Sequence, residues 1–333
     1  MLLMNPEPSM DSIAPIAPTV FATPTFRTLI AEQFKLQAMQ LQISLQDGHA
    51  IRIPAFMRKS LTGKKTVILG AGFDKTSQIP DVTSEDYGHV IERLAEELYA
   101  TDVEWLEVRT THHIPLLTDE SDKVELNVDI NTTVDDVWNS LSTNTRKNIR
   151  RPLKRGFTST VGNSAELLEQ FYQLYRMSLH DIGSLPHPKS FFNQLLQECG
   201  KYIAIFVGYM DGIPVVSSIS FVSDTEVYGA WSGIHTDYKK HNVFLAMLWQ
   251  MVEYCGNTGR KTYNLGRSSA GSNPHQFKLK LANRIHKIYY YRIKTVAPRP
   301  PQSAIHHTAS WIIRNTPEVV MHSLSRALLA RFY

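Results

Sequence analysis

The sequence predicts an α/β (α+β) protein of two similar domains in tandem, each with a mixed, mostly antiparallel sheet flanked by helices. Its 333 residues, 43% of them hydrophobic, supply enough apolar material for two compact cores. Two hairpin patterns occur far apart in the chain, and each is followed by the same order of strand, helix and strand. Such an internal repeat is typical of a duplicated folding unit.

The first segment, residues 1 to 24, is expected to be a loose, disordered arm. Small residues surround five prolines in it: Pro6, Pro8, Pro15, Pro18 and Pro24. Such a composition buries too little apolar surface to order itself. The segment also lacks the basic start and long apolar run of a secretory signal, and no stretch has the length needed to span a bilayer.

Each domain is expected to begin its sheet with a hairpin. Residues 41–53 alternate apolar and polar side chains around Asp47-Gly48, and an Asp-Gly pair favours a tight turn because glycine tolerates positive φ. Residues 202–210 and 213–221 flank Asp211-Gly212 in the same way. Both segments are therefore predicted to form two antiparallel strands.

The elements after each hairpin correspond in order. They are a strand (66–69 and 226–231), a helix (85–99 and 244–254) and a second strand (103–109 and 261–267). The two strands in each copy should pair in parallel, since the helix provides the crossover. This places an N-terminal domain at 25–133 and a C-terminal domain at 158–298. Coincidence is the alternative, because strand-helix-strand units are common.

The segment between the domains, residues 134–157, is predicted to be a basic connecting helix that Pro152 bends or restarts. Arg146, Arg150 and Lys154 follow one another at intervals of four, and Lys147, Arg151 and Arg155 form the adjacent row. This face would meet tRNA phosphates, a nucleotide-sugar pyrophosphate or anionic lipid headgroups. Alternatively, it is a solvated helix face.

The same segment carries a family resemblance. Its run Leu141-Ser-Thr-Asn-Thr-Arg-Lys-Asn-Ile-Arg150 is similar to the connecting segment of Fem-family and BioF2-like acyltransferases. Further matching motifs in the second half are Asp181-Ile-Gly183, Asn264-Leu-Gly266-Arg267-Ser268-Ser269 and Gln276-Phe277-Lys278. Together they resemble FemAB-related proteins of exopolysaccharide and PEP-CTERM systems, which implies tandem GNAT-like domains and acyl transfer to an amine.

One stretch departs from the acetyl-CoA enzymes of this fold. They place a glycine-rich turn before the helix that follows the central strands, so that helix N–H groups hold the pyrophosphate. Here residues 237–244 contain no glycine, which argues against a pyrophosphate-binding turn for CoA and fits the aminoacyl-tRNA donor that the resemblance to Fem-type enzymes implies. No permanently bound cofactor is expected, and the resemblance leaves aminoacyl-tRNA or acyl-CoA as the acyl donor and co-substrate.

The resemblance implies that Lys278, near the start of the last helix, contacts the reacting end of the donor. Its ammonium would stabilise the oxyanion that forms when the amine attacks the ester carbonyl. Phe277 would provide a stacking face for a terminal nucleotide base. The alternative is a surface lysine whose stem lies along a core phenylalanine.

Two further positions complete the predicted catalytic set. Arg267, just past a strand, would bind a phosphate or carboxylate with help from Ser268 and Ser269, unless these residues only form a turn. Asp181 would receive a proton or orient the acceptor amine, and the alternative is a helix end stopped by Gly183.

The resemblance implies that the central strands of this fold separate and leave a groove, the slot for the acyl carrier. Trp231 and Asn242 are expected to line this groove, although Trp231 is also a candidate core residue. No metal site is expected, because the 13 histidines show no metal-ligand spacing. The two cysteines, Cys199 and Cys255, form no cluster, which favours a reducing cytoplasmic setting.

The chemistry expected is N-acyl or aminoacyl transfer from an activated ester or thioester to an amine of a cell-envelope or exopolysaccharide precursor, such as a peptidoglycan precursor. The acceptor would lie on the first domain and the donor end near Lys278. An acetyl-CoA-dependent sugar acetyltransferase of exopolysaccharide assembly is one alternative, and a non-catalytic module that binds a polyanion or a membrane is another. Residues 299–333 read as an amphipathic helical tail that docks on the protein or lies on the inner face of the membrane.

Overall fold

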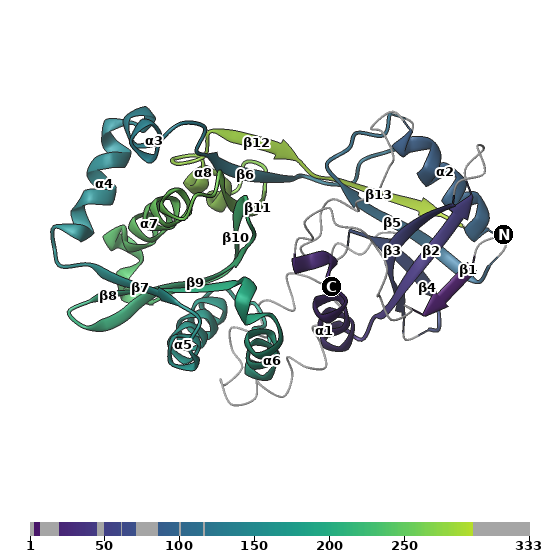
Figure 1. Ribbon diagram of the computed structural model, residues 1–333, viewed down its shortest axis with the longest axis horizontal. Helices are drawn as coiled ribbons and strands as arrows, with labels where there is room; N and C mark the ends of the chain where they lie inside the picture. Colours follow the sequence, from purple (N-terminus) through teal and green to yellow (C-terminus); the bar gives the residue numbers. More distant parts are fainter. Residues whose placement is uncertain are drawn as a thin grey trace. The chain divides into compact units, whose positions relative to one another are not determined.

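The computed structural model describes residues 3–6, 20–44, 50–60, 62–70, 86–99, 101–115 and 117–295. The chain forms two compact units, each with its own mixed sheet (Figure 1). Within the described residues, the first unit ends at Lys123 and resumes at Lys287, and the second runs from Val124 to His286. The predicted α/β fold of two sheets flanked by helices is confirmed.

The first sheet has the strand order β1-β2-β3-β4-β5-β13. Its strands are β1 (Leu3–Pro6), β2 (Gln37–Ser44), β3 (Ala50–Lys59), β4 (Lys65–Leu69), β5 (Val103–Thr110) and β13 (Tyr289–Lys294). β2 and β3 pair antiparallel as predicted, although the Asp47-Gly48 turn lies outside the described residues. β4 and β5 pair in parallel across α2 (Tyr87–Leu98), whose apolar face packs on this sheet.

The predicted loose arm contains two short elements in its described part. β1 adds an antiparallel strand to the edge of β2, and a 3-10 turn, η1 (Val20–Ala22), precedes α1 (Pro24–Phe34). Thr23 caps α1 with its hydroxyl, which accepts from the Phe26 N–H, and Pro24 occupies the first turn, where no N–H is needed. Residues 7–19 of the arm lie outside the described part of the chain.

The second sheet has the order β12-β6-β11-β10-β9-β8-β7. Its strands are β12 (Arg284–Lys287), β6 (Lys123–Asp129), β11 (Thr262–Ser269), β10 (Glu226–Ile234), β9 (Ile213–Val222), β8 (Ile203–Met210) and β7 (Thr158–Gly162). The β8–β9 turn confirms the hairpin prediction, since Asp211 (φ 52°) and Gly212 (φ 76°) both adopt the left-handed conformation that a type I′ turn requires. β10 and β11 pair in parallel across α7 (Val243–Asn257), again as predicted.

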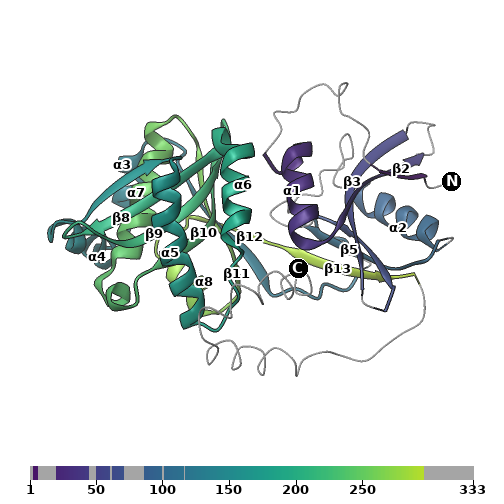
Figure 2. The same cartoon turned by 90° about the horizontal axis from the view of Figure 1, so that it is seen from below.

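Helices cover both faces of the second sheet (Figures 1 and 2). α5 (Ala165–Asp181) and α6 (Lys189–Cys199) lie on one face, where α5 contacts β8, β9 and β10. α7 lies on the other face, in an apolar cluster that includes Leu248, Met251 and Tyr263. Cys199 and Cys255 are buried and unpaired, and burial raises the pKa of both thiols to about 11.

The segment 134–157 forms two helices rather than one. α3 (Val134–Ser140) has a capping box between Thr133 and Asp136, and α4 (Thr143–Leu153) begins at a second cap, Ser142. Leu141 is extended between them, so the helices are separate. α4 runs through Pro152 without restarting and ends one residue later, at Leu153. α4 packs against α7, and both helices therefore belong to the second unit.

Each sheet takes a strand from beyond its own stretch of sequence. β6 follows β5 along the chain but lies beside β11 in the second sheet. β13 follows the second domain but pairs antiparallel with β5, from Tyr289–Thr110 to Lys294–Trp105. The boundary at residue 298 assigned β13 to the second domain, whereas its hydrogen bonds place it in the first sheet.

Close contact between α5 and β10 yields a stability prediction. A Cβ atom added at Gly233 would lie 2.3 Å from the Tyr175 backbone N and 2.4 Å from the Leu174 carbonyl carbon. Backbone atoms cannot rotate away as a side chain does, so Gly233→Ala should lower the free energy of unfolding by about 1–3 kcal/mol. Gly200→Ala is the control, because its nearest neighbour is Leu196 Cδ1 at 3.8 Å. Chemical denaturation checks both, and equal midpoints would contradict the packing.

Candidate active site

β10 and β11 stop pairing midway along their length. Their parallel register runs from Glu226–Thr262 to Tyr228–Asn264. Beyond it β10 continues beside β9 as far as Ile234, with a bulge between Gly229 and Trp231. A bulge leaves a residue outside the regular ladder and bends the strand locally. Such separating strands match the slot for the acyl carrier that the family resemblance implies.

β11 bends where the two strands separate. Gly266 has φ +72°, a conformation that side chains with a Cβ adopt only under strain. A Cβ there would also lie 3.0 Å from the Gly229 carbonyl oxygen of β10. Glycine thus allows β11 to turn while its backbone stays close to β10.

Lys278 lies against this bend. It is the last residue of α8 (Asn273–Lys278), not near the start of the last helix as the sequence suggested. Its Nζ donates to the carbonyl oxygens of Gly266 (3.2 Å) and Arg267 (3.0 Å). Burial and the nearby Arg267 charge lower the pKa of Lys278 to about 8. The Arg267 backbone therefore lies beside the Lys278 ammonium, and the catalytic roles of the two side chains stay predictions.

The Lys278 ammonium has three N–H groups, and the two carbonyl oxygens account for two of them. The third is available to an oxygen that gains negative charge during reaction. At neutral pH a group with a pKa of about 8 is mostly protonated. The geometry therefore suits oxyanion stabilisation, in which a fixed donor meets charge that develops in the transition state.

The residues next to Lys278 differ in exposure. The Arg267 side chain is exposed, and Ser268 is buried, with a hydroxyl that makes no hydrogen bond within the described part of the protein. Ser269 is half-buried, and its carbonyl accepts from the Ser272 hydroxyl at 2.6 Å, which fixes the turn into α8. A ligand role for Arg267, Ser268 and Ser269 stays a prediction.

Phe277 packs beside α7. Its ring lies edge-to-face with Phe244 at 5.6 Å between centroids, and the Lys280 ammonium lies 5.0 Å from its centroid. The ring is partly buried against the core cluster. Phe277 thus anchors α8 on the α7 face, and its proposed role in stacking a nucleotide base stays a prediction.

Asp181 contacts the segment that leads into α7. Its carboxylate accepts from Thr236 Oγ1 (2.5 Å) and Lys239 Nζ (2.7 Å), both in the 3-10 helix η3 (Thr236–His241). Burial alone would raise the pKa of Asp181, but these two donors outweigh it and hold the pKa below its usual value. A carboxylate with a lowered pKa is a weaker base, so the contacts favour a role in holding η3 over one in accepting a proton.

Asn242 ends η3 and starts α7. It has φ 59°, the left-handed conformation for which glycine and then asparagine are best suited, and its side chain does not cap the helix. Asparagine thus supplies the backbone conformation that a glycine would supply at this turn. The absence of glycine in 237–244 is therefore a weaker argument against a phosphate-binding turn than the sequence suggested.

Trp231 lies in an aromatic cluster beside α6. Its ring contacts His187, Phe191, Phe192 and Phe221 at centroid distances of 5.2 to 5.8 Å. The side chain is only half-buried. Packing thus accounts for most of its surroundings, and its proposed place in a groove stays a prediction.

The basic face of α4 is the surface formed by Arg146, Lys147, Arg150, Arg151, Lys154 and Arg155. Five of these side chains are exposed and Arg146 is half-buried, while Thr145, Ile149 and Pro152 form the buried face. None of the six cations forms an ion pair with a carboxylate in the described parts of the chain. Arg150 lies over the Trp138 ring at 5.0 Å. The predicted concentration of positive charge is therefore present on α4 and the two residues that follow it.

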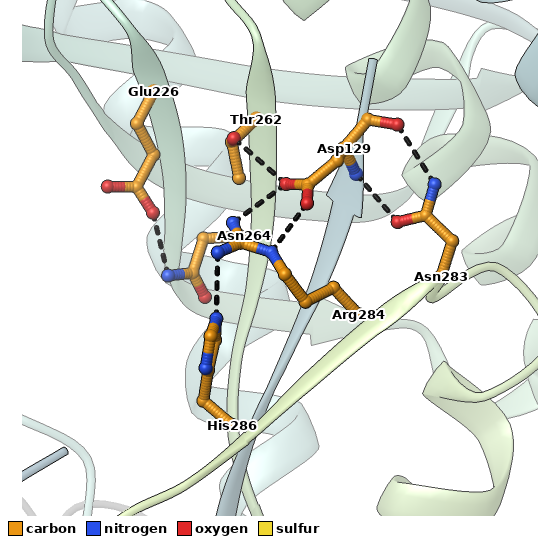
Figure 3. A network of polar contacts seen from close by, with 7 residues as sticks. All are labelled: Asp129, Glu226, Thr262, Asn264, Asn283, Arg284 and His286. Carbon is orange, nitrogen blue, oxygen red and sulfur yellow. Dashed lines mark hydrogen bonds and ion pairs between the residues drawn. The ribbon is translucent and has the colours of Figure 1, made fainter. Parts of the chain in front are cut away.

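A polar network that sequence reasoning missed joins β6, β11 and β12 (Figure 3). Asp129 accepts from Thr262 Oγ1 (3.0 Å) and Arg284 Nη2 (2.7 Å), and its backbone N–H donates to Asn283 Oδ1 (2.8 Å). Asn264 Nδ2 donates to Glu226 Oε1 at 2.7 Å. One residue in the sequence could have indicated this network: Asn264 is polar but lies between Tyr263 and Leu265 in β11.

Within the parts of the chain that the structure describes, no three His, Cys, Asp or Glu side chains are placed to bind a metal ion. No described helix is both long and apolar enough to cross a membrane. His306, His307 and the predicted tail at 299–333 lie outside the described residues.

The fold and this site define a GNAT-type acyltransferase, and comparison with known proteins agrees. The model of the acetyltransferase (GNAT) domain family matches residues 143–278 of the chain. No curated protein sequence matches the chain. The expected FemAB-like, tandem GNAT-type acyltransferase is thus confirmed at the level of fold and reaction class.

Three solved structures illustrate the likeness. FemX is 12% identical, with a TM-score of 0.60 over 83% of this chain and 93% of that one. L-PGS from Bacillus licheniformis is 14% identical, with a TM-score of 0.51 over 83% and 88%. A tandem GNAT protein from the clavulanic acid biosynthesis pathway is 9% identical, with a TM-score of 0.50 over 79% and 85%. At these identities the likeness concerns the fold alone.

Proposed function

We propose that the protein transfers an acyl or aminoacyl group from an activated ester or thioester to an amine of a cell-envelope or exopolysaccharide precursor. The observation that carries this proposal is the Lys278 ammonium, held by two backbone carbonyls where β10 and β11 separate. The GNAT family match and the FemX-like architecture support the reaction class.

In the proposed reaction the amine nitrogen attacks the acyl carbonyl carbon, and its oxygen gains negative charge next to Lys278. The new C–N bond forms, and the C–O bond of an ester donor or the C–S bond of a thioester donor breaks. The amine loses one proton, and the leaving hydroxyl or thiol gains one. An unprotonated amine needs little help from a base when the ester is already activated, which fits the lowered pKa of Asp181.

The basic face of α4 favours aminoacyl-tRNA as the donor. Both α4 and α8 belong to the α7 side of the second sheet, where α4 packs on α7 and Phe277 contacts Phe244. A donor that reaches Lys278 along this side passes a surface with six cations. Phosphates neutralised by such cations make affinity strongly dependent on salt.

Replacing Arg146, Arg150 and Lys154 together by Gln should weaken tRNA binding and flatten its dependence on salt. Each lost phosphate contact should reduce the slope of log K against log salt concentration by about 0.7–0.9. Filter binding between low and moderate salt measures the slope. Gln at Lys35, Lys201 and Lys261, three exposed lysines outside α4, is the control with the same charge change. Equal slopes for both triple variants would contradict a tRNA role for the basic face.

An acetyl-CoA-dependent acetyltransferase of exopolysaccharide assembly is the second candidate. The left-handed Asn242 and the uncapped start of α7 favour it, because a helix N-terminus suits a pyrophosphate. Incubation with labelled acetyl-CoA or with charged tRNA, each with an amine acceptor, separates the two donors. Turnover with acetyl-CoA alone would contradict the tRNA donor.

A third candidate is a non-catalytic module that binds a polyanion or a membrane surface through α4, with peripheral contact at the inner face of a membrane. It requires that Lys278→Ala and Arg267→Ala leave biological function intact while neutralisation of the basic face abolishes it. Loss of transfer in either single variant, with normal folding, would exclude this candidate.

A further inference from the structure

Asn264 is a buried polar residue at the last paired position of β10 and β11, and 4% of its surface is exposed. Its Nδ2 donates to Glu125 Oε1 at 2.8 Å and to Glu226 Oε1 at 2.7 Å. Its Oδ1 accepts from the backbone N–H of Gly266 at 2.8 Å. Two carboxylates require the NH₂ end of the amide and an N–H requires the oxygen end, so the chemistry of the partners fixes its orientation.

The bond from Gly266 N–H to Asn264 Oδ1 spans two residues of one strand. Asparagine side chains that bond the backbone two residues later stabilise a turn in place of a regular ladder. Here the turn is the left-handed bend at Gly266 (φ +72°). The two carboxylates hold the amide from the other side, so the side chain cannot rotate without breaking charge-assisted hydrogen bonds.

The bend determines where the next two carbonyl groups point. The carbonyl oxygens of Gly266 and Arg267 are the two acceptors of the Lys278 ammonium, at 3.2 and 3.0 Å. A continuous chain of hydrogen bonds therefore runs from Glu125 and Glu226 through Asn264 and the Gly266 bend to Lys278. Transition-state stabilisation requires donors placed to within a fraction of an ångström, so such support has a functional consequence.

We propose that Asn264 is a positioning residue that holds the Gly266 bend and thereby aims two backbone carbonyls at the Lys278 ammonium. This role rests on the proposed function in so far as Lys278 serves the reaction, but the placement itself is independent of any substrate. The Asp129–Arg284–Asn283 part of the network in Figure 3 lies farther along β6 and ties β12 to it without contacting Gly266.

The test measures the ionisation of Lys278 in the full chain. NMR of protein labelled with ¹³C at lysine Cε follows each lysine against pH, and the signal lost in Lys278→Arg identifies this one. In Asn264→Ala the carbonyl oxygens of Gly266 and Arg267 should no longer point at the Lys278 ammonium. The ammonium should then move into water, because a buried ammonium without acceptors is costly. Its pKa should therefore rise from about 8 by at least about one unit toward the ordinary lysine value.

Asn127→Ala is the matched control. Asn127 lies on the neighbouring strand β6, is 2% exposed, and its Oδ1 makes no hydrogen bond in the described part of the protein, so its loss leaves a comparable cavity without touching Gly266. In Asn127→Ala the pKa of Lys278 should equal that in the wild type. If Asn264→Ala does not fold, Gly266→Ala disturbs the same bend from the other end of the link and should raise the Lys278 pKa likewise.

The proposal is overturned if the Lys278 pKa is unchanged in folded Asn264→Ala or Gly266→Ala, because the ammonium would then remain in place without the link. A lowered pKa would instead support it, since an ammonium that stays buried with displaced acceptors loses its proton more easily. It is also overturned if Asn127→Ala raises the Lys278 pKa equally, since general loosening would then explain the effect. Both outcomes are measured as the pKa of Lys278 and not as acyl transfer. The test therefore stays valid if the proposed acyltransferase function is wrong.

Discussion

Replacement of Lys278 by Ala should lower the rate of acyl transfer by about 10²–10³-fold, the usual effect of removing one preorganised oxyanion donor. The ammonium lies where β10 and β11 separate, and the carbonyl oxygens of Gly266 and Arg267 fix it there. An interaction made only in the transition state contributes to kcat, so KM should change little. Single-turnover transfer from a labelled donor measures the effect.

Lys280→Ala is the control for this substitution. Lys280 is exposed, two positions beyond Lys278, and its ammonium lies 5.0 Å from the centroid of the Phe277 ring. It carries the same charge, so a general electrostatic effect on a polyanionic donor should appear equally in both variants. If Lys278→Ala and Lys280→Ala transfer the acyl group at the same rate within error, Lys278 does not stabilise the oxyanion.

The dependence of transfer on pH should reveal Lys278 directly. An alkyl amine acceptor becomes reactive as it loses its proton, so the rate rises about tenfold per pH unit below the pKa of the amine. Lys278 must keep its proton to stabilise the oxyanion, and its pKa is about 8. Above pH 8 the loss of protonated Lys278 should cancel the gain in free amine, and the wild-type profile should level off.

Lys278→Arg should lack this plateau, because a guanidinium stays charged across the range. Its rate will be lower overall, yet it should keep rising about tenfold per pH unit between pH 8 and the pKa of the amine. The shape of the profile is the readout, after subtraction of hydrolysis of the donor without enzyme. Parallel wild-type and Lys278→Arg profiles from pH 7 to pH 9.5 would contradict a role for the Lys278 proton.

Local patterns in the sequence were sufficient to predict most of the fold. Asp211-Gly212 adopts the doubly left-handed turn that its residue types favour, and the strands on both sides pair as expected. The parallel pairing of β10 with β11 followed from the crossover helix alone. These features depend on residues close together in the chain, and periodicity and turn chemistry report on such residues well.

Long-range pairing was not predictable in this way. The Tyr-Tyr-Tyr-Arg-Ile-Lys run of β13 is typical of a strand, but nothing in it indicates that the partner is β5, almost two hundred positions earlier. The division of residues 134–157 into α3 and α4 did have a local signal, since Thr133 and Ser142 are both good N-caps. The run of cations obscured it.

The candidate site was predicted only in part, because some of its contacts join residues that are far apart in the chain. The motifs at Arg267 and Lys278 indicated that the two residues act together, and the structure places the Arg267 backbone carbonyl oxygen 3.0 Å from Lys278 Nζ. Asn264 was quoted only as part of a motif, because its partners Glu125 and Glu226 come from two other strands. Asp181 was predicted to receive a proton or to orient the acceptor amine. Its contacts with Thr236 and Lys239 depend on tertiary structure and had no signal in the sequence.

A structure of the protein with a stable donor analogue bound tests most directly whether acyl transfer takes place between β10 and β11. Non-hydrolysable analogues of acetyl-CoA and of the charged 3′ end of tRNA are the two probes. We expect one of them to place its acyl carbonyl oxygen about 3 Å from Lys278 Nζ. An analogue bound with its carbonyl away from Lys278, on a surface that neither strand reaches, would contradict the assignment of this site.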